Sequence, residues 1–261
     1  MNRGKKILGI VVLFNPPERI VDNIKSYNRQ VDKLIAFDNS VSDNEELKTK
    51  LQQLENLIYY SNKKNNGIAA ALNYGAKKAS EWDYEFLLTM DQDSRASENL
   101  VGKLLDYALK FENLGIISPY HKNKFGTITH LNEEYSQKTA VKTSGNLISI
   151  DSFKSIGKFR EDYFIDYVDI EYCFRLIQNN YKAIQVNSIY LDHEEADMKQ
   201  INLFFRKVYP YNHSPFRYYY KTRNLCYLIK EYKNVAPKLL KLEKREYKAT
   251  VMKMLLFERK K

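Results

Sequence analysis

The sequence predicts an α/β fold built around a largely parallel β-sheet. Between residues 7 and 118, short apolar segments typical of buried strands alternate with longer segments of helical pattern. The 261 residues, 44% of them hydrophobic, suffice for a large core. The expected strands are Ile7–Phe14, Lys33–Phe37, Leu57–Tyr60, Glu85–Met90 and Gly115–Ser118, and the expected helices are Glu18–Arg29, Asp43–Leu54, Ile68–Ser80 and Glu98–Phe111. Such alternation is typical of βαβ units, whose strands are parallel.

The rest of the chain divides by pattern and by charge. A strand is expected at Val141–Ile150, a helix at Phe164–Tyr181, and a strand with a following loop at Lys182–Asp197. The net charge is +10, but residues 201–261 carry 16 Lys and Arg against 4 Glu, so the preceding residues are nearly neutral. We therefore expect one α/β domain over residues 1–200 and a basic, aromatic-rich, helical extension over residues 201–261.

The composition argues against several classes of protein. Cys173 and Cys226, the two cysteines, lie far apart, which suggests neither a disulfide framework nor a zinc site and favours a reducing, cytoplasmic setting. The apolar run Ile7–Phe14 is too short for a signal peptide, and no segment approaches the roughly 20 apolar residues that span a bilayer. A phosphate loop of the G-x-x-x-x-G-K type is also absent from the sequence.

Polar residues follow the ends of the predicted parallel strands. Asn15 follows the first strand, Asp38 the second, and Asp91 and Asp93 the fourth. Ligands of such sheets gather at the carboxyl ends of the strands, so we expect these residues to face one crevice. The pair Asn66–Gly67 precedes an Ala-rich helix whose N-terminus could bind an anion, although an ordinary turn explains the pair equally well.

Asp91 and Asp93 form a short acidic motif in the turn after a buried strand. Two carboxylates separated by one residue can reach the same small volume, and hard oxygen ligands suit Mg²⁺ or Mn²⁺. The alternative is that the acids only form a turn before the helix expected near Glu98. His193 follows a later apolar strand, and its imidazole could complete a metal shell there, although a single His is more often a polar loop residue.

The segment Phe164–Leu176 contains a candidate general base. On a helix, Asp166 and Asp169 would be neighbours, and partial burial of Asp169 among apolar residues would raise its basicity. Acids in the first turn of a helix could instead simply complement its dipole. Glu171 and Arg175 have the spacing of an ordinary i,i+4 ion pair.

Taken in order, these segments resemble the family 2 glycosyltransferases of the GT-A fold, and more narrowly their bacterial rhamnosyltransferase-like branch. The likeness covers Ile7 to about Asp197 and is weaker through "SPFRYYYKTRNLCYL". The matching segments are "VVLFNP", "AFDNS", "NNGIAAALNYGAKKA", "LLTMDQDS", "TSGNLISI", "FIDYVDIEYCFRL" and His193. Their joint order and spacing, rather than any single motif, carry the resemblance.

This resemblance implies a role for each matching residue. Asp38 would contact the nucleobase or ribose of a sugar nucleotide. Asp91 would hold the ribose or a metal-bound water, Asp93 would ligate Mn²⁺ or Mg²⁺, and His193 would add a further ligand. Asp169 matches the catalytic base, although Val168 stands where the family usually has Glu. The other positions implied to bind the donor are Asn15, Asn66, Gly67, Asn73, Ser144 and Gly145, with Asn146 beside the last two.

The activity implied by the resemblance is an inverting transfer of a sugar from a nucleotide diphosphate. The branch favours dTDP-L-rhamnose over other dTDP- or UDP-sugars, and the acceptor would be a cell-surface polysaccharide or a lipid-linked glycan. A metal-dependent nucleotidyltransferase would also need a carboxylate pair, but "FNPPERI" after the first strand is not the phosphate loop expected of one. A nucleic-acid-binding protein could explain the basic extension, but the nearly neutral body argues against it.

The basic extension suggests a membrane surface as partner. Eight aromatic residues lie between residues 201 and 220, and the helical pattern after Pro237 places apolar residues beside Lys and Arg. Such a helix can lie on an anionic membrane, here the inner face of the plasma membrane. The alternatives are packing on the α/β domain or formation of a homodimer. The lack of a Q-x-x-R-W motif and of an apolar span argues against a processive polysaccharide synthase.

Overall fold

The computed structural model describes residues 4, 6–42, 44–122, 133–193, 201–203 and 206–258. Its contacts divide the chain into two compact units. The first, which we call the sheet unit, comprises Met1–Phe164 and Val168–Glu194. The second, the C-terminal unit, comprises Ile165–Tyr167 and Glu195–Lys261. The short segment Ile165–Tyr167 therefore belongs with the C-terminal unit, although its neighbours on both sides belong to the sheet unit.

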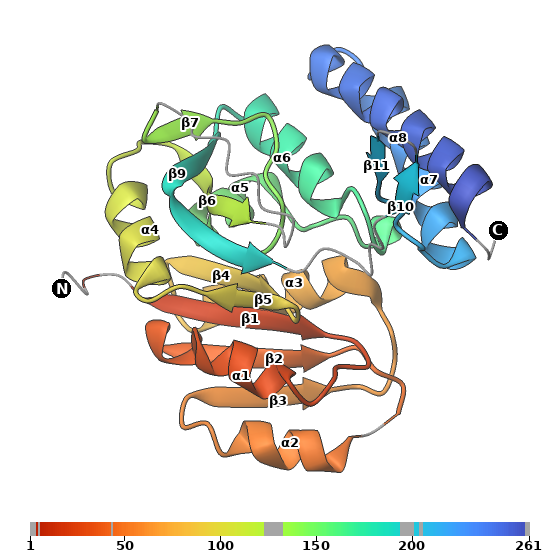
Figure 1. Cartoon of the computed structure of the whole chain (residues 1–261). Coiled ribbons are helices and arrows are strands. Elements are labelled where there is room, and N and C mark those ends of the chain that lie inside the picture. Colours follow the sequence, from red (N-terminus) through yellow and green to blue (C-terminus); the bar gives the residue numbers. More distant parts are fainter. Residues whose placement is uncertain are drawn as a thin grey trace. The chain divides into compact units, whose positions relative to one another are not determined.

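The sheet unit is built on a mixed sheet whose strand order is β3-β2-β1-β4-β8-β6-β9-β5, with β7 paired to β9. β8, β5 and β7 run against the other strands, and the arrowheads of β1, β2 and β3 point the same way (Figure 1). The sheet is thus mostly parallel, as predicted. Its strands are β1 (Ile7–Leu13), β2 (Lys33–Asp38), β3 (Leu57–Ser61), β4 (Phe86–Asp91), β5 (Ser94–Ala96), β6 (Leu114–Lys122), β7 (Tyr135–Gln137), β8 (Asn146–Ser149) and β9 (Lys182–His193).

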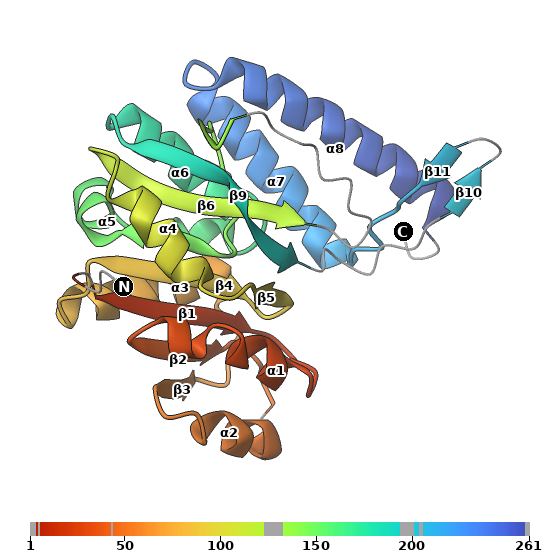
Figure 2. The ribbon, with the colours of Figure 1, turned by 60° about the vertical axis from the view of Figure 1, so that its left-hand side comes forward.

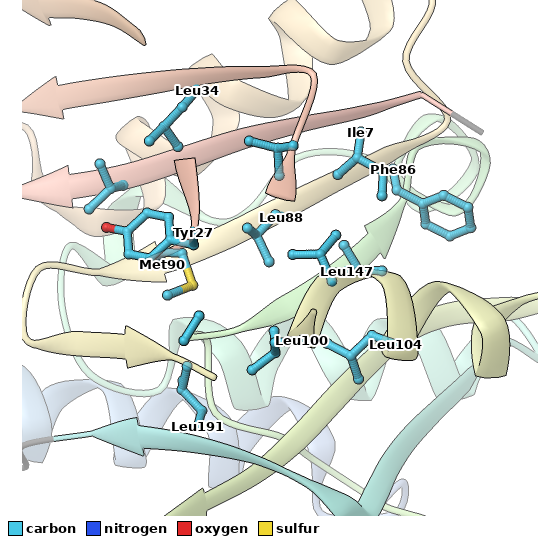
Figure 3. Close-up of a cluster of buried hydrophobic side chains, with 14 of the residues drawn as sticks. Ile7, Tyr27, Leu34, Phe86, Leu88, Met90, Leu100, Leu104, Leu147 and Leu191 are labelled. Atoms are coloured by element: carbon cyan, nitrogen blue, oxygen red, sulfur yellow. The ribbon is translucent and has the colours of Figure 1, made fainter. Parts of the chain in front are cut away.

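Helices cover both faces of this sheet. The larger apolar core lies under α1, α2 and α4, and Figure 3 shows Leu100 and Leu104 of α4 facing Leu88 and Leu147 of the sheet. The other face carries α3, α5 and α6. The helices are α1 (Ile20–Lys25), α2 (Glu45–Gln52), α3 (Gly67–Glu81), α4 (Leu100–Ala108), α5 (Ile150–Ile156) and α6 (Val168–Gln178), with 3₁₀ turns at Asn28–Gln30 and Glu161–Tyr163.

Several elements differ from the sequence prediction. The helix expected over Glu18–Arg29 is only α1 and a 3₁₀ turn. The strand expected over Val141–Ile150 is reduced to β8, which begins after Gly145, a residue with φ +77°, and ends at Ser149, which caps α5 by accepting a hydrogen bond from the Ser152 amide. α6 begins four residues later than predicted, since Phe164, Asp166 and Tyr167 have φ values of +59°, +59° and +66°. Asp166 therefore lies outside the helix, and it is not the helical neighbour of Asp169 that the pattern suggested.

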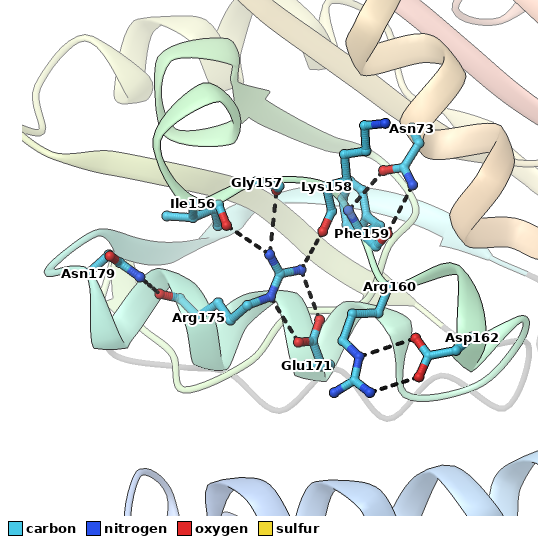
Figure 4. A network of polar contacts seen from close by, with 10 residues as sticks. All are labelled: Asn73, Ile156, Gly157, Lys158, Phe159, Arg160, Asp162, Glu171, Arg175 and Asn179. Atoms are coloured by element: carbon cyan, nitrogen blue, oxygen red, sulfur yellow. Dashed lines mark hydrogen bonds and ion pairs between the residues drawn. The ribbon is translucent and has the colours of Figure 1, made fainter.

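A buried ion pair anchors α6 to the end of α5 (Figure 4). The Arg175 guanidinium donates to both carboxylate oxygens of Glu171, at 2.8 and 2.9 Å, and Glu171 is fully buried. The same guanidinium donates to the Ile156 carbonyl at 3.0 Å and to the Lys158 carbonyl at 2.8 Å. This pair is more than the ordinary surface interaction that its spacing predicted, because it also satisfies carbonyls at the C-terminus of α5.

The C-terminal unit consists of a two-stranded hairpin and two long helices. The hairpin pairs β10 (Ile201–Leu203) with β11 (Arg206–Val208), and α7 (Pro215–Tyr232) lies beside α8 (Pro237–Phe257) (Figure 2). Arg217 forms an ion pair with Asp166 at 3.1 Å, and the Asn224 amide donates to the carbonyls of Ile165 and Asp166. These bonds explain why residues 165–167 belong to this unit. Among the described helices, none is long and apolar enough to cross a membrane.

The ion pair of Glu171 and Arg175 gives a stability prediction. We expect Arg175→Met to lower the free energy of unfolding by about 3 kcal/mol, because a buried carboxylate then loses its cationic partner. Urea denaturation followed by circular dichroism measures the change. The double variant Glu171→Gln/Arg175→Met is the control and should recover part of the loss, and equal loss in both variants would show that the buried charge is not the cause.

Candidate active site

Asp91, Gln92 and Asp93 form a short turn between β4 and β5, which we call the acidic turn. Hydrogen bonds from neighbouring residues hold this turn in place. The Gln92 side chain accepts a hydrogen bond from the Phe14 amide at 2.9 Å and donates to the Phe14 carbonyl at 3.3 Å. The Asn23 side chain donates to the Gln92 carbonyl at 3.0 Å. Gln92 therefore links the carboxyl ends of β1 and β4. It fixes the backbone between Asp91 and Asp93.

Ser144 and Gly145 lie beside the acidic turn and the end of β4. The Ser144 hydroxyl accepts from the Asp91 amide at 3.0 Å and donates to the Ser94 hydroxyl at 2.7 Å. The Gly145 amide donates to the Thr89 carbonyl at 2.7 Å. Gly145 has φ +77°, and a Cβ there would lie 2.8 Å from Leu191, so this close crossing requires glycine. The two hydrogen bonds of Ser144 thus hold the beginning and the end of the acidic turn.

Asp91 and Asp93 lie one residue apart at the carboxyl end of β4, on either side of Gln92. Both side chains are partly buried. Burial raises the pKa of the fully buried Tyr27 hydroxyl, and the charges of Asp91 and Asp93 raise it further. Two carboxylates at this spacing supply hard oxygen ligands that fit Mn²⁺ or Mg²⁺ with open positions for water and phosphate.

His193, the third predicted metal ligand, is described only by its backbone. β9 ends at His193, whose backbone pairs with Ser94, the residue directly after Asp93. The backbone of His193 therefore reaches the acidic turn, while its side chain lies outside the described residues. Among the side chains that are described, no group of three His, Cys, Asp or Glu residues is arranged to hold a metal ion.

Asp169 stands at the second position of α6, and Lys142 connects it electrostatically to the acidic turn. Asp169 is partly buried, and one of its carboxylate oxygens accepts from the Ile170 amide at 2.9 Å. Lys142 is exposed as a whole residue, but desolvation of its ammonium lowers the pKa of this group, while the charges of Asp169 and Asp91 act in the opposite direction. Both carboxylates therefore act on the same ammonium group.

Sequence reasoning missed Lys142 as a member of this site. It directly precedes the Thr-Ser-Gly segment, which the sequence already singled out, but nothing in that pattern indicates the direction of its side chain. The backbone explains its position. The Lys142 carbonyl accepts from the Asn146 side chain, and the Thr143 carbonyl accepts from the Thr89 hydroxyl, so Lys142 is fixed close to the end of β4.

Asp38 is buried at the end of β2, and its carboxylate is already bonded within the protein. One oxygen accepts from the Ser40 amide at 2.8 Å and the other from the Tyr59 hydroxyl at 2.6 Å. The Ser40 hydroxyl in turn accepts from the Asn15 amide at 2.7 Å. Asp38 and Asn15 thus belong to one network that shapes the loops after β1 and β2.

Asn66 and Gly67 extend this network to the start of α3. The Asn39 side chain accepts from the Asn66 amide at 3.3 Å and donates to the Gly67 carbonyl at 3.0 Å. Gly67 has φ +81°, and a Cβ there would lie 2.5 Å from the Phe164 carbonyl oxygen. That oxygen accepts from the Ile68 amide at 2.8 Å. The first amides of α3 are therefore already bonded, and the helix N-terminus is less open to an anion than the sequence suggested.

Asn73 is the one predicted donor-binding residue that the structure places in a different network. Its side chain exchanges hydrogen bonds with the amide and carbonyl of Phe159, at 2.8 and 2.9 Å, and donates to Glu161 at 2.9 Å (Figure 4). These bonds use both ends of the amide group to hold residues 159–161 against α3. A contact between Asn73 and the donor stays a prediction that no observed geometry supports.

The chain is similar to known glycosyltransferases in sequence and in fold. The chain is 29% identical over 260 residues to the dTDP-rhamnosyl transferase RfbF of Shigella flexneri, across 92% of this chain and 84% of that protein. A crystal structure of GalNAc-T7 with UDP, GalNAc and Mn²⁺ aligns with the whole chain at a TM-score of 0.63 and 14% identity. The chain spans 60% of the length of that structure, and the likeness shows the GT-A fold alone.

The family assignment rests on a longer stretch of sequence. The model of the family described as Glycosyl transferase family 2 matches residues 10–174, which include the second half of β1, the acidic turn, Lys142 and Asp169. More than half of the chain is covered. The protein is a GT-A glycosyltransferase and belongs to glycosyl transferase family 2.

Proposed function

We propose that this glycosyltransferase is metal-dependent and inverting, and that it transfers L-rhamnose from dTDP-L-rhamnose to a cell-surface polysaccharide or a lipid-linked glycan. The rhamnosyl donor is supported by the name of the Shigella flexneri relative. The mechanism is supported by one observation above all, the way Gln92 and Ser144 hold the turn of Asp91 and Asp93 at the carboxyl ends of β1 and β4. Two carboxylates at this edge of the sheet suit a reaction in which a cation neutralises a departing diphosphate.

In this proposal Asp169 acts as the general base. It takes the proton from the acceptor hydroxyl while that oxygen forms a bond to the anomeric carbon, and the nucleoside diphosphate leaves with the electrons of the broken bond. Asp93, Asp91 and His193 would hold Mn²⁺ or Mg²⁺, which when bound neutralises the charge that develops on the diphosphate. Lys142 adds positive charge beside the carboxylates, which reduces the repulsion between them and an incoming diphosphate.

We assign donor recognition to the loops after β1 and β2, to the start of α3, and to Ser144 and Gly145. Asp38 is buried and bonded to Ser40 and Tyr59, so it serves the nucleotide mainly by fixing the shape of these loops. Asn15, Asn66 and Gly67 are attached to the same network. We therefore infer that main-chain groups of these loops, and not only the Asp38 carboxylate, contact the nucleobase and ribose.

The first test is donor binding measured by titration calorimetry. We expect dTDP and dTDP-L-rhamnose to bind more tightly with Mn²⁺ than without it, and Asp93→Ala to weaken the Mn²⁺-dependent binding by at least about tenfold. Asp106→Ala, which removes an exposed carboxylate from α4, is the matched control. Binding of UDP but not dTDP would replace the donor, and no nucleotide binding under either condition would contradict the proposal.

A second test concerns the base. Asp169→Asn should lower kcat by about 10²-fold or more, with little change in donor binding, because only proton removal from the acceptor is lost. Asp151→Asn, which changes an exposed acid in the first turn of α5, controls for the loss of a helix N-terminal charge. Turnover close to that of the unchanged enzyme would exclude Asp169 as the base.

We further propose that the C-terminal unit binds the anionic inner face of the plasma membrane. α8 carries six Lys and Arg against two Glu. Exposed apolar side chains lie on both long helices of this unit, namely Phe216, Tyr219, Leu242, Met252, Leu255 and Leu256. Basic residues next to exposed apolar ones suit a helix that lies in a lipid–water interface. Such attachment would bring the enzyme to a lipid-linked acceptor.

Sedimentation with vesicles tests this attachment. The protein should sediment with vesicles that contain phosphatidylglycerol and much less with pure phosphatidylcholine, and added salt should weaken the binding. Leu255→Ser/Leu256→Ser should reduce it several-fold, because the two most C-terminal exposed apolar side chains of α8 are lost. If the variant sediments as well as the unchanged protein, these residues do not bind the membrane. If analytical ultracentrifugation shows a homodimer that the variant dissociates, they belong to a subunit interface instead.

A further inference from the structure

Tyr27 is one of several buried polar side chains of the sheet unit with an unsatisfied polar atom, and its ring lies beside Met90 of β4. Its side chain is fully buried, and its hydroxyl oxygen has no hydrogen-bond partner in the described part of the chain. A buried hydroxyl normally finds a partner, since burying it without one is unfavourable. A phenylalanine would fill the same space among Met90 and its apolar neighbours without that penalty.

The hydroxyl of Tyr27 is directed toward the acidic turn. Figure 3 shows the ring beside Met90, with its oxygen toward the end of the sheet where β4 turns into β5. Asp91 and Asp93 are the two charged groups that act on this hydroxyl. The oxygen that lacks a partner therefore belongs to the surroundings of the candidate cation site and not to an unrelated part of the core.

The segment that carries Tyr27 already supports the acidic turn and the strand after it. Asn23 donates to the Gln92 carbonyl, and the Ser26 hydroxyl accepts from the Ala96 amide at 3.0 Å. The Gln30 side chain donates to the Ser97 carbonyl and accepts from the Val101 amide, both at 3.0 Å. Residues 23–30 thus hold the backbone before and after Asp93, and Tyr27 lies in the middle of this support.

We propose that Tyr27 is a positioning residue for the divalent cation of this transferase, through a hydrogen bond from its hydroxyl to the carboxylate of Asp91 or Asp93. A carboxylate that binds a cation with one oxygen is oriented by a donor to the other, and such outer partners tune metal affinity. The hydroxyl would gain its partner when the two carboxylates turn toward the cation. This inference rests on the proposed metal dependence and adds a residue that the acidic motif does not contain.

The test is Tyr27→Phe, which removes one oxygen atom and keeps the ring. We expect the dissociation constant for Mn²⁺, measured by calorimetry and by electron paramagnetic resonance of free Mn²⁺ with dTDP present, to rise about tenfold. The melting temperature without metal should stay the same or rise, because an unsatisfied buried hydroxyl is lost. Mn²⁺ binding should thus weaken without a loss of stability, which a merely structural tyrosine would not produce.

Tyr172→Phe is the matched control, since Tyr172 is also fully buried while neither Asp91 nor Asp93 acts on its hydroxyl. Unchanged Mn²⁺ affinity in Tyr27→Phe would overturn the inference, and so would an equal loss of dTDP binding with and without Mn²⁺. Failure of the proposed function itself looks different: the unchanged protein would then bind no Mn²⁺ that Asp93→Ala removes.

Discussion

The site depends on the register of the parallel strands. β1 pairs with β2 so that Leu13 lies opposite Asp38, and with β4 so that Val12 lies opposite Asp91. Three strands thus end within one residue of each other at the same edge of the sheet, and each continues into a loop of polar residues. A slip of one residue would exchange the faces of the side chains and separate the two aspartates. The buried, almost wholly apolar strands make such a slip costly, so the core sets the position of the chemistry.

This arrangement gathers negative charge at one edge, and the fold compensates for it in two ways. Lys142 carries a positive charge on which the carboxylates of Asp91 and Asp169 both act. Hydrogen bonds from main-chain amides and hydroxyls stabilise other carboxylates. At Asp38, the Ser40 amide and the Tyr59 hydroxyl donate to the two carboxylate oxygens. Excess negative charge that is left over favours a divalent cation when a diphosphate must enter, because Coulomb repulsion between anions is large in a partly desolvated site.

Much of the fold could be predicted from the sequence, because local pattern determined it. The alternation of apolar strands and helices up to residue 118 gave the parallel half of the sheet with small errors in the bounds. The pattern failed where tertiary contacts override it. β5 is three residues long and pairs with the distant β9, so it has no local signal, and β8 is shorter than the predicted strand because the chain turns at Gly145 before it. Motifs singled out Asp91, Asp93 and Asp169 as candidates, whereas they did not single out Lys142 or Tyr27, because only the folded chain determines where long side chains point.

Val168 stands where the family usually has Glu, and the contacts of α6 account for this difference. Val168 is buried at the first position of the helix, so a carboxylate there would need a partner of its own in the interior. The buried carboxylate of this helix is instead Glu171, one turn along, and Arg175 joins it to the carbonyls that end α5. Asp169 lies between these two buried residues and is itself only partly buried. Glu171 and Arg175 therefore hold the helix that carries the candidate base, and an acidic residue directly before Asp169 is not required for that purpose.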